Sequence, residues 1–381
     1  MKTTVQHVTF PDNRRILMIS DIHGHAGGLK QLLEQVHFSK DDILVIVGDL
    51  VEKGPESLRT VRLVMELCKT HTVYPLMGNV DCWRLARILS DDPDMQQHIL
   101  QYSLKARKWW GISFLDELCQ EIGVLPDEST DTQELFHKLR EHFSKEFHFL
   151  QSLPTILESQ RMIFVHGGIP HEQVDDLVGT DAMPLMKWDA FHDTGLSFQK
   201  YVVGGHWPVN LYPDHKLSTN PIIDLERRII GLDGGCGISR DGQLNLVIVP
   251  NWQSNDFSFL SWNPYPVITA LDEQPSSTDY ECIRWAREHE RVTVVQQQDD
   301  WADILYQSHK MKIPSAFLYS HGNDTCCDGV TDHLLSVVPG DKLSLVHKAS
   351  FGCLVKKDGV LGWYNGKYTT STASELSEEA L

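Results

Sequence analysis

The sequence predicts an α/β fold for residues 1–250 and small all-β modules for the rest of the chain. Two observations predict the α/β part: short apolar runs recur without alternation, and segments with helical spacing separate the early runs. A third observation, the change of character after Pro250, marks the second part. A chain of 381 residues is also long enough for two or three domains.

Seven apolar runs predict the strands: 16–20, 42–48, 73–77, 161–165, 201–205, 229–233 and 244–249. Runs that do not alternate with polar residues are typical of strands buried on both faces. Apolar residues at helical spacing predict helices over 29–36 and 58–67, the second preceded by Gly-Pro-Glu-Ser. Residues 84–150 are polar and helical in pattern, which predicts an insertion or a cap.

The region after residue 250 lacks these patterns at first. Residues 251–290 hold few periodic runs and predict a connector. A weak internal repeat then follows, and it resembles bacterial SH3-like modules at 291–320 and 334–370, with GWYNGKY as the best match. The alternative interpretation is a general β-meander similarity. The acidic end of the chain, 371–381, is predicted to be disordered.

Composition narrows the class of partner. The net charge of −18 disfavours binding to nucleic-acid backbones, which requires a basic surface. It leaves open a small phosphorylated ligand, because bound cations reverse the local potential. No apolar run approaches the roughly 20 residues of a membrane span, and the N-terminus has no signal-peptide pattern. We therefore expect a cytoplasmic protein without a membrane partner.

Polar side chains follow five of the predicted strands, at the point where each strand ends. They are Asp21, His23, Asp49, Asn79, His166 and His206. In open α/β sheets this edge is where ligands bind. Three histidines with carboxylate and amide oxygens form a donor set suited to divalent transition metals. Two such ions sharing a carboxylate are a common solution for phosphoester hydrolysis.

The order of these motifs is similar to that of a known family. "DIHGH", "GDLVEKGPES", "GNVD", "VHGGIP" and "GGHWP" resemble the successive motifs of the calcineurin-like metallophosphoesterases, over about residues 14–250. They point to the branch with phosphoprotein phosphatases and bacterial diadenosine tetraphosphatases. The resemblance implies a four-layer α/β/β/α sandwich and two divalent metal ions, with manganese, iron or zinc as the usual metals.

The resemblance also implies a role for each residue. Asp21 and His23 would bind the first ion, Asp49 would bridge, and Asn79, His166 and His206 would bind the second. Asp233 would orient a ligand histidine; the alternative is a turn or helix-cap aspartate. Lys53 and Asn79 are the expected phosphate-binding residues.

The chain departs from the family at two motifs. Glu52-Lys53-Gly54 stands where relatives carry Asp-Arg-Gly, and Asn79-Val80-Asp81 stands where they carry Asn-His-Glu. The family histidine protonates the leaving oxygen and is positioned by the Asp of Asp-Arg-Gly, so Val80 removes a proton donor. Lys53 keeps a charge but loses the planar fork of arginine. Asp189 lies near the place of a phosphate-binding arginine.

These departures predict a substrate whose leaving group needs no proton, such as a dinucleoside polyphosphate or a phosphodiester. His25 is a candidate substitute acid, although a surface or ligand-supporting histidine is the simpler interpretation. Asp81 and Cys82 are weaker candidates, and Trp207 could stack on a base or pack in the core. The alternatives are a metal-binding sensor or scaffold with little turnover, and a serine/threonine-type protein phosphatase. A protein or peptide partner could bind the SH3-like modules.

Overall fold

The computed structural model describes residues 1–284 and 289–370, which form two compact units. The first unit consists of Met1–Pro208, Pro221–Ile238 and Gln243–Trp262. The second unit contains Val209–Asn220, Ser239–Gly242 and the chain from Asn263 onward. The predicted disordered end, 371–381, lies outside the described residues.

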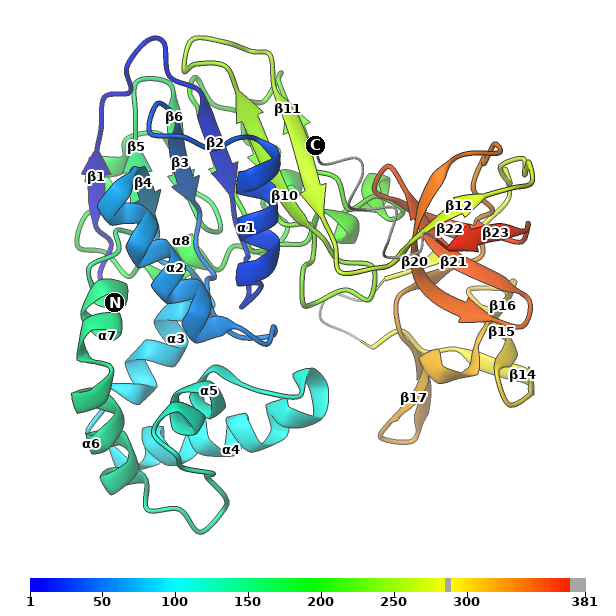
Figure 1. Ribbon diagram of the computed structural model, residues 1–381, viewed down its shortest axis with the longest axis horizontal. Coiled ribbons are helices and arrows are strands. Elements are labelled where there is room, and N and C mark those ends of the chain that lie inside the picture. Colours follow the sequence, from blue (N-terminus) through cyan, green and yellow to red (C-terminus); the bar gives the residue numbers. More distant parts are fainter. Residues whose placement is uncertain (285–288, 371–381) are drawn as a thin grey trace. The chain divides into compact units, whose positions relative to one another are not determined.

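Two mixed sheets form the centre of the first unit (Figure 1). One has the order β1 (Val5–His7), β5 (Ile156–Glu158), β6 (Met162–Val165), β7 (Tyr201–Gly204), β9 (Ile229–Gly231), β8 (Ile222–Asp224). The other has the order β11 (Ser258–Trp262), β10 (Leu244–Val249), β2 (Ile16–Ile19), β3 (Ile43–Ile46), β4 (Thr72–Pro75). Each of the seven predicted runs overlaps one of these strands, and six contain the whole strand; β4 begins one residue before its run. The neighbours β2, β3 and β4 are parallel, as are β6, β7 and β9, so the ends of these strands share an edge.

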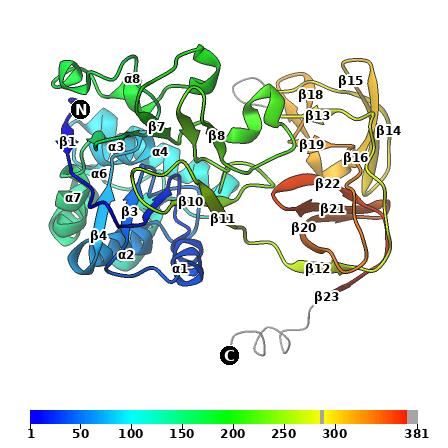
Figure 2. The same ribbon diagram turned by 90° about the horizontal axis from the view of Figure 1, so that it is seen from above.

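Successive side chains of a strand point to opposite faces of its sheet, and they therefore pack into different layers of the first unit. On β2, Met18 packs into a core shared with Phe164 of β6, so this core lies between the two sheets. The neighbouring Leu17 instead packs into a cluster with helices α1 (Ala26–Gln35) and α2 (Ser57–Thr70). On β6, Ile163 faces the opposite side and packs with Leu185 of the short helix α8 (Met183–Met186). Figure 2 shows α1 and α2 on one side of the strands and α8 on the other. The four-layer α/β/β/α sandwich is therefore confirmed.

The helical region after β4 begins earlier than the sequence pattern indicates, at the second residue of GNVD. Its helices are α3 (Asn79–Ile88), α4 (Pro93–Trp110), α5 (Phe114–Glu121), α6 (Thr132–His142) and α7 (Ser144–Gln151). The side chains of Asp92, Ser113 and Asp131 cap α4, α5 and α6. The Glu117 carboxylate of α5 accepts hydrogen bonds from the first two N–H groups of α2, at 2.7 and 2.8 Å. The helical region thereby fixes the start of α2, directly after the GDLVEKGPE loop.

The second unit is all-β. Its largest sheet has the order β22 (Val360–Tyr364), β21 (Gly352–Lys357), β20 (Lys342–Ala349), β12 (Val267–Ala270), β23 (Tyr368–Thr370). Smaller sheets pair β14 (Thr293–Gln297), β15 (Trp301–Tyr306) and β16 (His309–Pro314), β17 (Leu318–His321) with β18 (Asp324–Cys327), and β13 (Cys282–Ile283) with β19 (Val330–Thr331). Single-turn 3₁₀ helices complete the two units at Val174–Leu177, Phe191–Thr194, Val209–Leu211, Pro213–His215 and Ser315–Phe317.

After residue 250, the strands are grouped differently from the predicted connector and two separate modules. The segment predicted as a connector contains β11, which extends a sheet of the first unit, and β12, which joins the largest sheet of the second unit. The β11 residues are mostly exposed, so they give no buried-strand pattern. The two segments predicted as separate modules share one apolar core, in which Ile304 and Ile313 pack with Leu354 and Trp363. The SH3-like identity of these sheets stays a prediction.

Two loops from the first part of the chain belong to the second unit. In the loop Ser239–Gly242, the buried Asp241 carboxylate accepts two hydrogen bonds from the Arg284 guanidinium, at 2.6 and 2.7 Å. The Lys356 Nζ donates to the backbone carbonyl of Asp241 at 2.7 Å. These contacts anchor the loop in the all-β unit. No helix in the described part of the chain has the length and apolar character needed to cross a bilayer.

Candidate metal centre

The backbone at the strand ends adopts an uncommon conformation. Asp21, His23, Asp49 and His206 all have positive φ, at 52°, 45°, 54° and 67°. Residues with a Cβ atom rarely occupy this region, and each such residue costs of order 1–3 kcal/mol unless the surroundings hold it there. Backbone strain of this kind concentrates at functional sites, so these strand ends are a candidate functional site.

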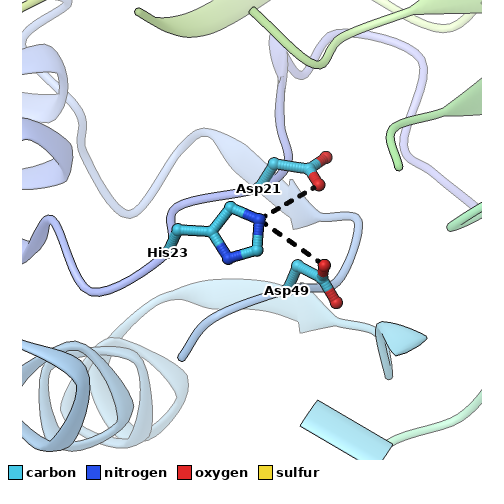
Figure 3. Close-up of side chains that lie close together, drawn as sticks. All are labelled: Asp21, His23 and Asp49. Atoms are coloured by element: carbon cyan, nitrogen blue, oxygen red, sulfur yellow. Dashed lines mark ion pairs between the residues drawn. The ribbon is translucent and has the colours of Figure 1, made fainter. Parts of the chain in front are cut away.

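Three of these side chains form a buried cluster. The ligand atoms of Asp21, His23 and Asp49 all lie within 4.8 Å of one another. Figure 3 shows one ring nitrogen of His23 facing both carboxylates. This Nε2 lies 3.7 Å from Asp21 Oδ1 and 3.6 Å from Asp49 Oδ2. The three residues come from the ends of β2 and β3, which are adjacent parallel strands.

A second group of predicted ligands adjoins this cluster. The Asn79 Oδ1 lies 3.0 Å from His166 Nε2 and 2.9 Å from His206 Nδ1. His166 Nε2 also lies 3.4 Å from Asp49 Oδ1. Asp49 therefore faces His23 with one oxygen and His166 with the other, as a bridging carboxylate would. The fold brings all six predicted side chains together.

The electrostatics of this group fit divalent cations. The Asp21 Oδ1 is buried and has no hydrogen-bond partner among the described residues. Burial raises the pKa of Asp21 to about 6, with a further contribution from Asp49. Burial alone would lower the pKa of His166, but the carboxylates of Asp49 and Asp21 outweigh it and raise this pKa to about 10. Nearby carboxylates with an unsatisfied oxygen, together with imidazole nitrogens, are donors that manganese, iron and zinc accept.

The other nitrogen of each histidine is held by an acceptor. His23 Nδ1 lies 3.1 Å from the Val51 carbonyl, and His166 Nδ1 lies 2.7 Å from the Val47 carbonyl. His206 is turned the other way, with Nε2 at 2.6 Å from Asp189 Oδ1. Such contacts fix the ring orientation of metal-binding histidines. Burial and the charge of His166 lower the pKa of His206 to about 4, so its ring is neutral at pH 7.

The contact between Asp189 and His206 was not predicted from the sequence. The histidine-orienting role was predicted for Asp233, whose Oδ1 instead accepts from the Gly235 N–H at 2.8 Å. The Asp233 Oδ2 is buried without a hydrogen-bond partner among the described residues. Asp189 lies 17 positions before His206 in the chain, so no local motif joins the two.

Two glycines let the loops approach the carboxylates. A Cβ atom at Gly78 would lie 2.1 Å from Asp49 Oδ1, and one at Gly205 would lie 2.1 Å from Asp21 Oδ2. Neither contact is sterically possible. These glycines allow Asn79 and His206, which follow them, to be placed against the cluster.

His25, the predicted substitute acid, is largely buried. Its Nδ1 lies 3.0 Å from the Ile22 carbonyl and 3.5 Å from Cys236 Sγ, and its ring lies beside Trp262. Burial lowers the pKa of His25, so at neutral pH the ring carries a proton in only a small fraction of molecules. These contacts favour the supporting interpretation over that of a general acid.

Asp81 joins the loop after β3 to the loop after β4. Its Oδ1 accepts from the N–H groups of Leu50 and Val51 at 2.9 and 3.1 Å, and its Oδ2 accepts from Gly78 N at 3.2 Å. Burial raises the pKa of Asp81 to about 7, and these N–H groups oppose that effect. All three contacts are structural, and Cys82, the next candidate, is buried with a raised pKa.

We expect Asp81→Asn to destabilise the first unit without removing a metal ligand. One of the three N–H groups would then face an amide NH₂ in place of an oxygen, which costs about 1.5–3 kcal/mol. Urea denaturation followed by the helical circular dichroism signal measures this, because the long helices belong to the first unit. An unchanged denaturation midpoint would contradict this role.

The loop Glu52–Lys53 lies beside the cluster. Lys53 Nζ is 2.9 Å from His23 Nε2, which places its charge next to the cluster of Asp21, His23 and Asp49. The Glu52 carboxylate turns away and accepts a hydrogen bond from Arg84 Nε at 2.5 Å. Trp207 is half-buried with its ring beside His206. Arg84 was not identified from the sequence as the partner of Glu52. A buried carboxylate such as Glu52 requires a cation beside it, and Arg84 is that cation.

Comparison with known proteins agrees with this site. The family model for calcineurin-like phosphoesterases matches residues 14–227, more than half of the chain. The chain is 25% identical over 220 residues to the asymmetrical bis(5′-nucleosyl)-tetraphosphatase PrpE of Oceanobacillus iheyensis, covering 51% of this chain and 78% of the relative. It is 29% identical over 180 residues to a symmetrical bis(5′-nucleosyl)-tetraphosphatase of Erwinia tasmaniensis, covering 44% of this chain and 53% of that relative.

Among solved structures, a metallophosphoesterase from Sphaerobacter thermophilus aligns with a TM-score of 0.36 and 18% identity, over 66% of this chain and 89% of the other. The family match, the strained strand ends and the Asp-His-Asp cluster agree with one another. The protein belongs to the calcineurin-like phosphoesterase family and is a metal-dependent phosphoesterase.

Proposed function

We propose that this protein is a binuclear phosphohydrolase that acts on a small phosphorylated substrate with a good leaving group. A dinucleoside polyphosphate is the first candidate substrate, and a phosphodiester is the second. The observation that carries the proposal is the grouping of six candidate metal donors at strand ends, in a chain that has a hydrocarbon side chain at Val80. The names of the relatives, which are tetraphosphatases, support the same substrate class.

The residues divide into two proposed ion sites. Asp21 and His23 would hold the first ion, Asn79, His166 and His206 would hold the second, and Asp49 would contact both. Two divalent ions held in this way activate water and stabilise the entering and leaving oxygens. Lys53 would place its ammonium beside the reacting phosphate, and Asn79 would contact a phosphate oxygen as well as an ion. Manganese, iron and zinc all suit these donors.

The hydrocarbon side chain of Val80 is the reason that we propose a substrate with a good leaving group. Its backbone N–H donates to Asp49 Oδ1 at 2.9 Å, and its side chain lies in the apolar core. A side chain of this kind donates no proton to a leaving alkoxide. A leaving phosphate is a much weaker base, with a pKa near 6, so it departs without that help.

A turnover screen with added manganese tests the proposal. It compares diadenosine tetraphosphate, a nucleoside diphosphate, bis(para-nitrophenyl) phosphate and a phosphoserine peptide. We expect turnover of the polyphosphate and the aryl diester, turnover of the peptide about 10²–10⁴-fold slower, and loss of all activity in EDTA. Absence of turnover with metal still bound would support the sensor or scaffold alternative. Preference for the peptide would support a protein phosphatase.

A partner for the second unit remains a separate prediction. This unit contains an open groove of about 730 Å³ lined by polar and aromatic residues, among them His289, Tyr306, His321 and Asp324. The His289 and His321 rings stack at 3.8 Å between centroids. We propose this groove as a candidate site for a peptide partner of the second unit.

A further inference from the structure

Two arginines stack on one tryptophan in the helical region of the first unit. The Arg87 guanidinium carbon lies 3.6 Å from the centre of the Trp83 ring, and that of Arg84 lies 4.2 Å from it. Arg84 also lies 4.0 Å from the centre of the Tyr102 ring on α4. We call Trp83, Arg84, Arg87 and Tyr102 the arginine cluster. Such stacking stabilises the planar guanidinium groups and fixes their positions.

The charges in the arginine cluster do not balance. Arg84 is buried and is paired with the buried Glu52 carboxylate. Arg87 forms no ion pair among the described residues; its Nη1 donates to the Trp83 carbonyl at 3.2 Å, and its buried Nε has no hydrogen-bond partner there. Burial and the neighbouring Arg84 lower the pKa of Arg87. Two cations beside one carboxylate form a region that attracts an anion, in a chain whose net charge is −18.

The arginine cluster lies on the helix that carries a predicted metal ligand. Asn79, Trp83 and Arg87 are four residues apart along α3, so they lie along one face of the helix. The hydrogen bond to Trp83 shows that the Arg87 side chain reaches back toward the N-terminus of α3. Its charge therefore lies about one helical turn, roughly 5–6 Å along the axis, from Asn79.

We propose that the arginine cluster binds a phosphate group of the substrate other than the one that is hydrolysed, with Arg87 as the principal contact. This inference rests on the proposed function and specifies its substrate class: a chain of several phosphates, in which one phosphate lies at the metal donors and another reaches Arg87. A polyphosphate chain supplies negative charges at spacings that fit one turn of α3. A substrate with a single phosphate cannot reach both places.

The test compares Arg87→Gln with wild type on two substrates in the presence of manganese. For diadenosine tetraphosphate we expect KM to rise by about 10- to 100-fold, which is the size of a lost charged hydrogen bond. For bis(para-nitrophenyl) phosphate we expect KM and kcat to stay within about threefold. Arg87→Lys should recover part of the loss, because it keeps the charge without the fork.

Arg161→Gln is the matched control. Arg161 precedes β6 and donates to Asn255 Oδ1, so it lies at the strand end opposite His166. This variant should leave both substrates unaffected. Equal losses on the two substrates in Arg87→Gln, or no loss on either, would overturn the inference.

A binding measurement separates this inference from the proposed function. Diadenosine tetraphosphate is titrated calorimetrically into wild type and Arg87→Gln in EDTA, where no turnover occurs. Weaker binding by the variant supports the arginine cluster even if wild type hydrolyses neither substrate. Equal affinity of the two proteins overturns it whatever the activity of the enzyme. Matching thermal unfolding of the two proteins shows that the variant is folded.

Discussion

Replacing Asp49 with asparagine is expected to reduce phosphoesterase turnover by at least about 10³-fold and to release bound metal. Asp49 faces His23 with one oxygen and His166 with the other, so it is the side chain common to both groups of donors. The amide has almost the same shape but no charge, and it offers one oxygen in place of two. Metal per chain, measured by elemental analysis after dialysis, should fall together with the rate.

The substitution is designed to leave the fold intact. The amide oxygen of the Asp49→Asn variant can still accept the hydrogen bond that Val80 N–H donates to Asp49 Oδ1 in the wild type. Asp256→Asn provides the matched control, since Asp256 is an exposed residue between β10 and β11. Full metal content with full activity in Asp49→Asn would refute the assignment of Asp49 as the shared ligand.

Introducing a histidine at Val80 is expected to raise turnover of a phosphoserine peptide by about 10- to 100-fold, because general-acid catalysis contributes typically 10²–10⁴-fold. Diadenosine tetraphosphate should change by less than about threefold, since its leaving group needs no proton. Steady-state kinetics on both substrates measures the difference. The gain should disappear as pH rises through the pKa of the new imidazole, because only its protonated form donates.

Val80→Leu controls for the change in packing. It enlarges the side chain within the same apolar cluster and supplies no proton. A gain in Val80→Leu equal to that in Val80→His would show that shape, not proton transfer, controls the rate. Equal gains of Val80→His on both substrates would remove the leaving-group argument.

Seven strands of the first unit and the grouping of six polar side chains at their ends could be predicted from the sequence, whereas β1, β5 and β8 were not predicted. A strand buried on both faces leaves an unalternating apolar run, and residues that follow parallel strands meet at one sheet edge. Asp21, His23 and Asp49 therefore cluster as their positions indicate. The edge strand β11 left no such pattern because most of its residues are exposed, and it fell within the predicted connector.

The supporting contacts could not be predicted, because they join residues that are distant in sequence. The pairing of Asp189 with His206 depends on the loop between β6 and β7, and that of Glu52 with Arg84 depends on where α3 begins. Asp81 looked like a candidate acid in the sequence, and the structure shows it accepting three backbone N–H groups. A side chain's type gives its chemistry, but burial and partners decide which chemistry is used.

The family, the strand ends that carry the donors and the hydrocarbon at position 80 follow from the amino-acid sequence alone. The apolar pattern of a strand and the type of each residue are local properties of the chain, so both can be read from short sequence motifs. Three other features became known only from the folded chain: Glu52 is neutralised by Arg84, Arg87 lies without a carboxylate partner among the described residues, and the two C-terminal segments share one core. Each of these three features depends on which distant segments are packed together when apolar residues are buried. A short stretch of sequence does not specify that packing.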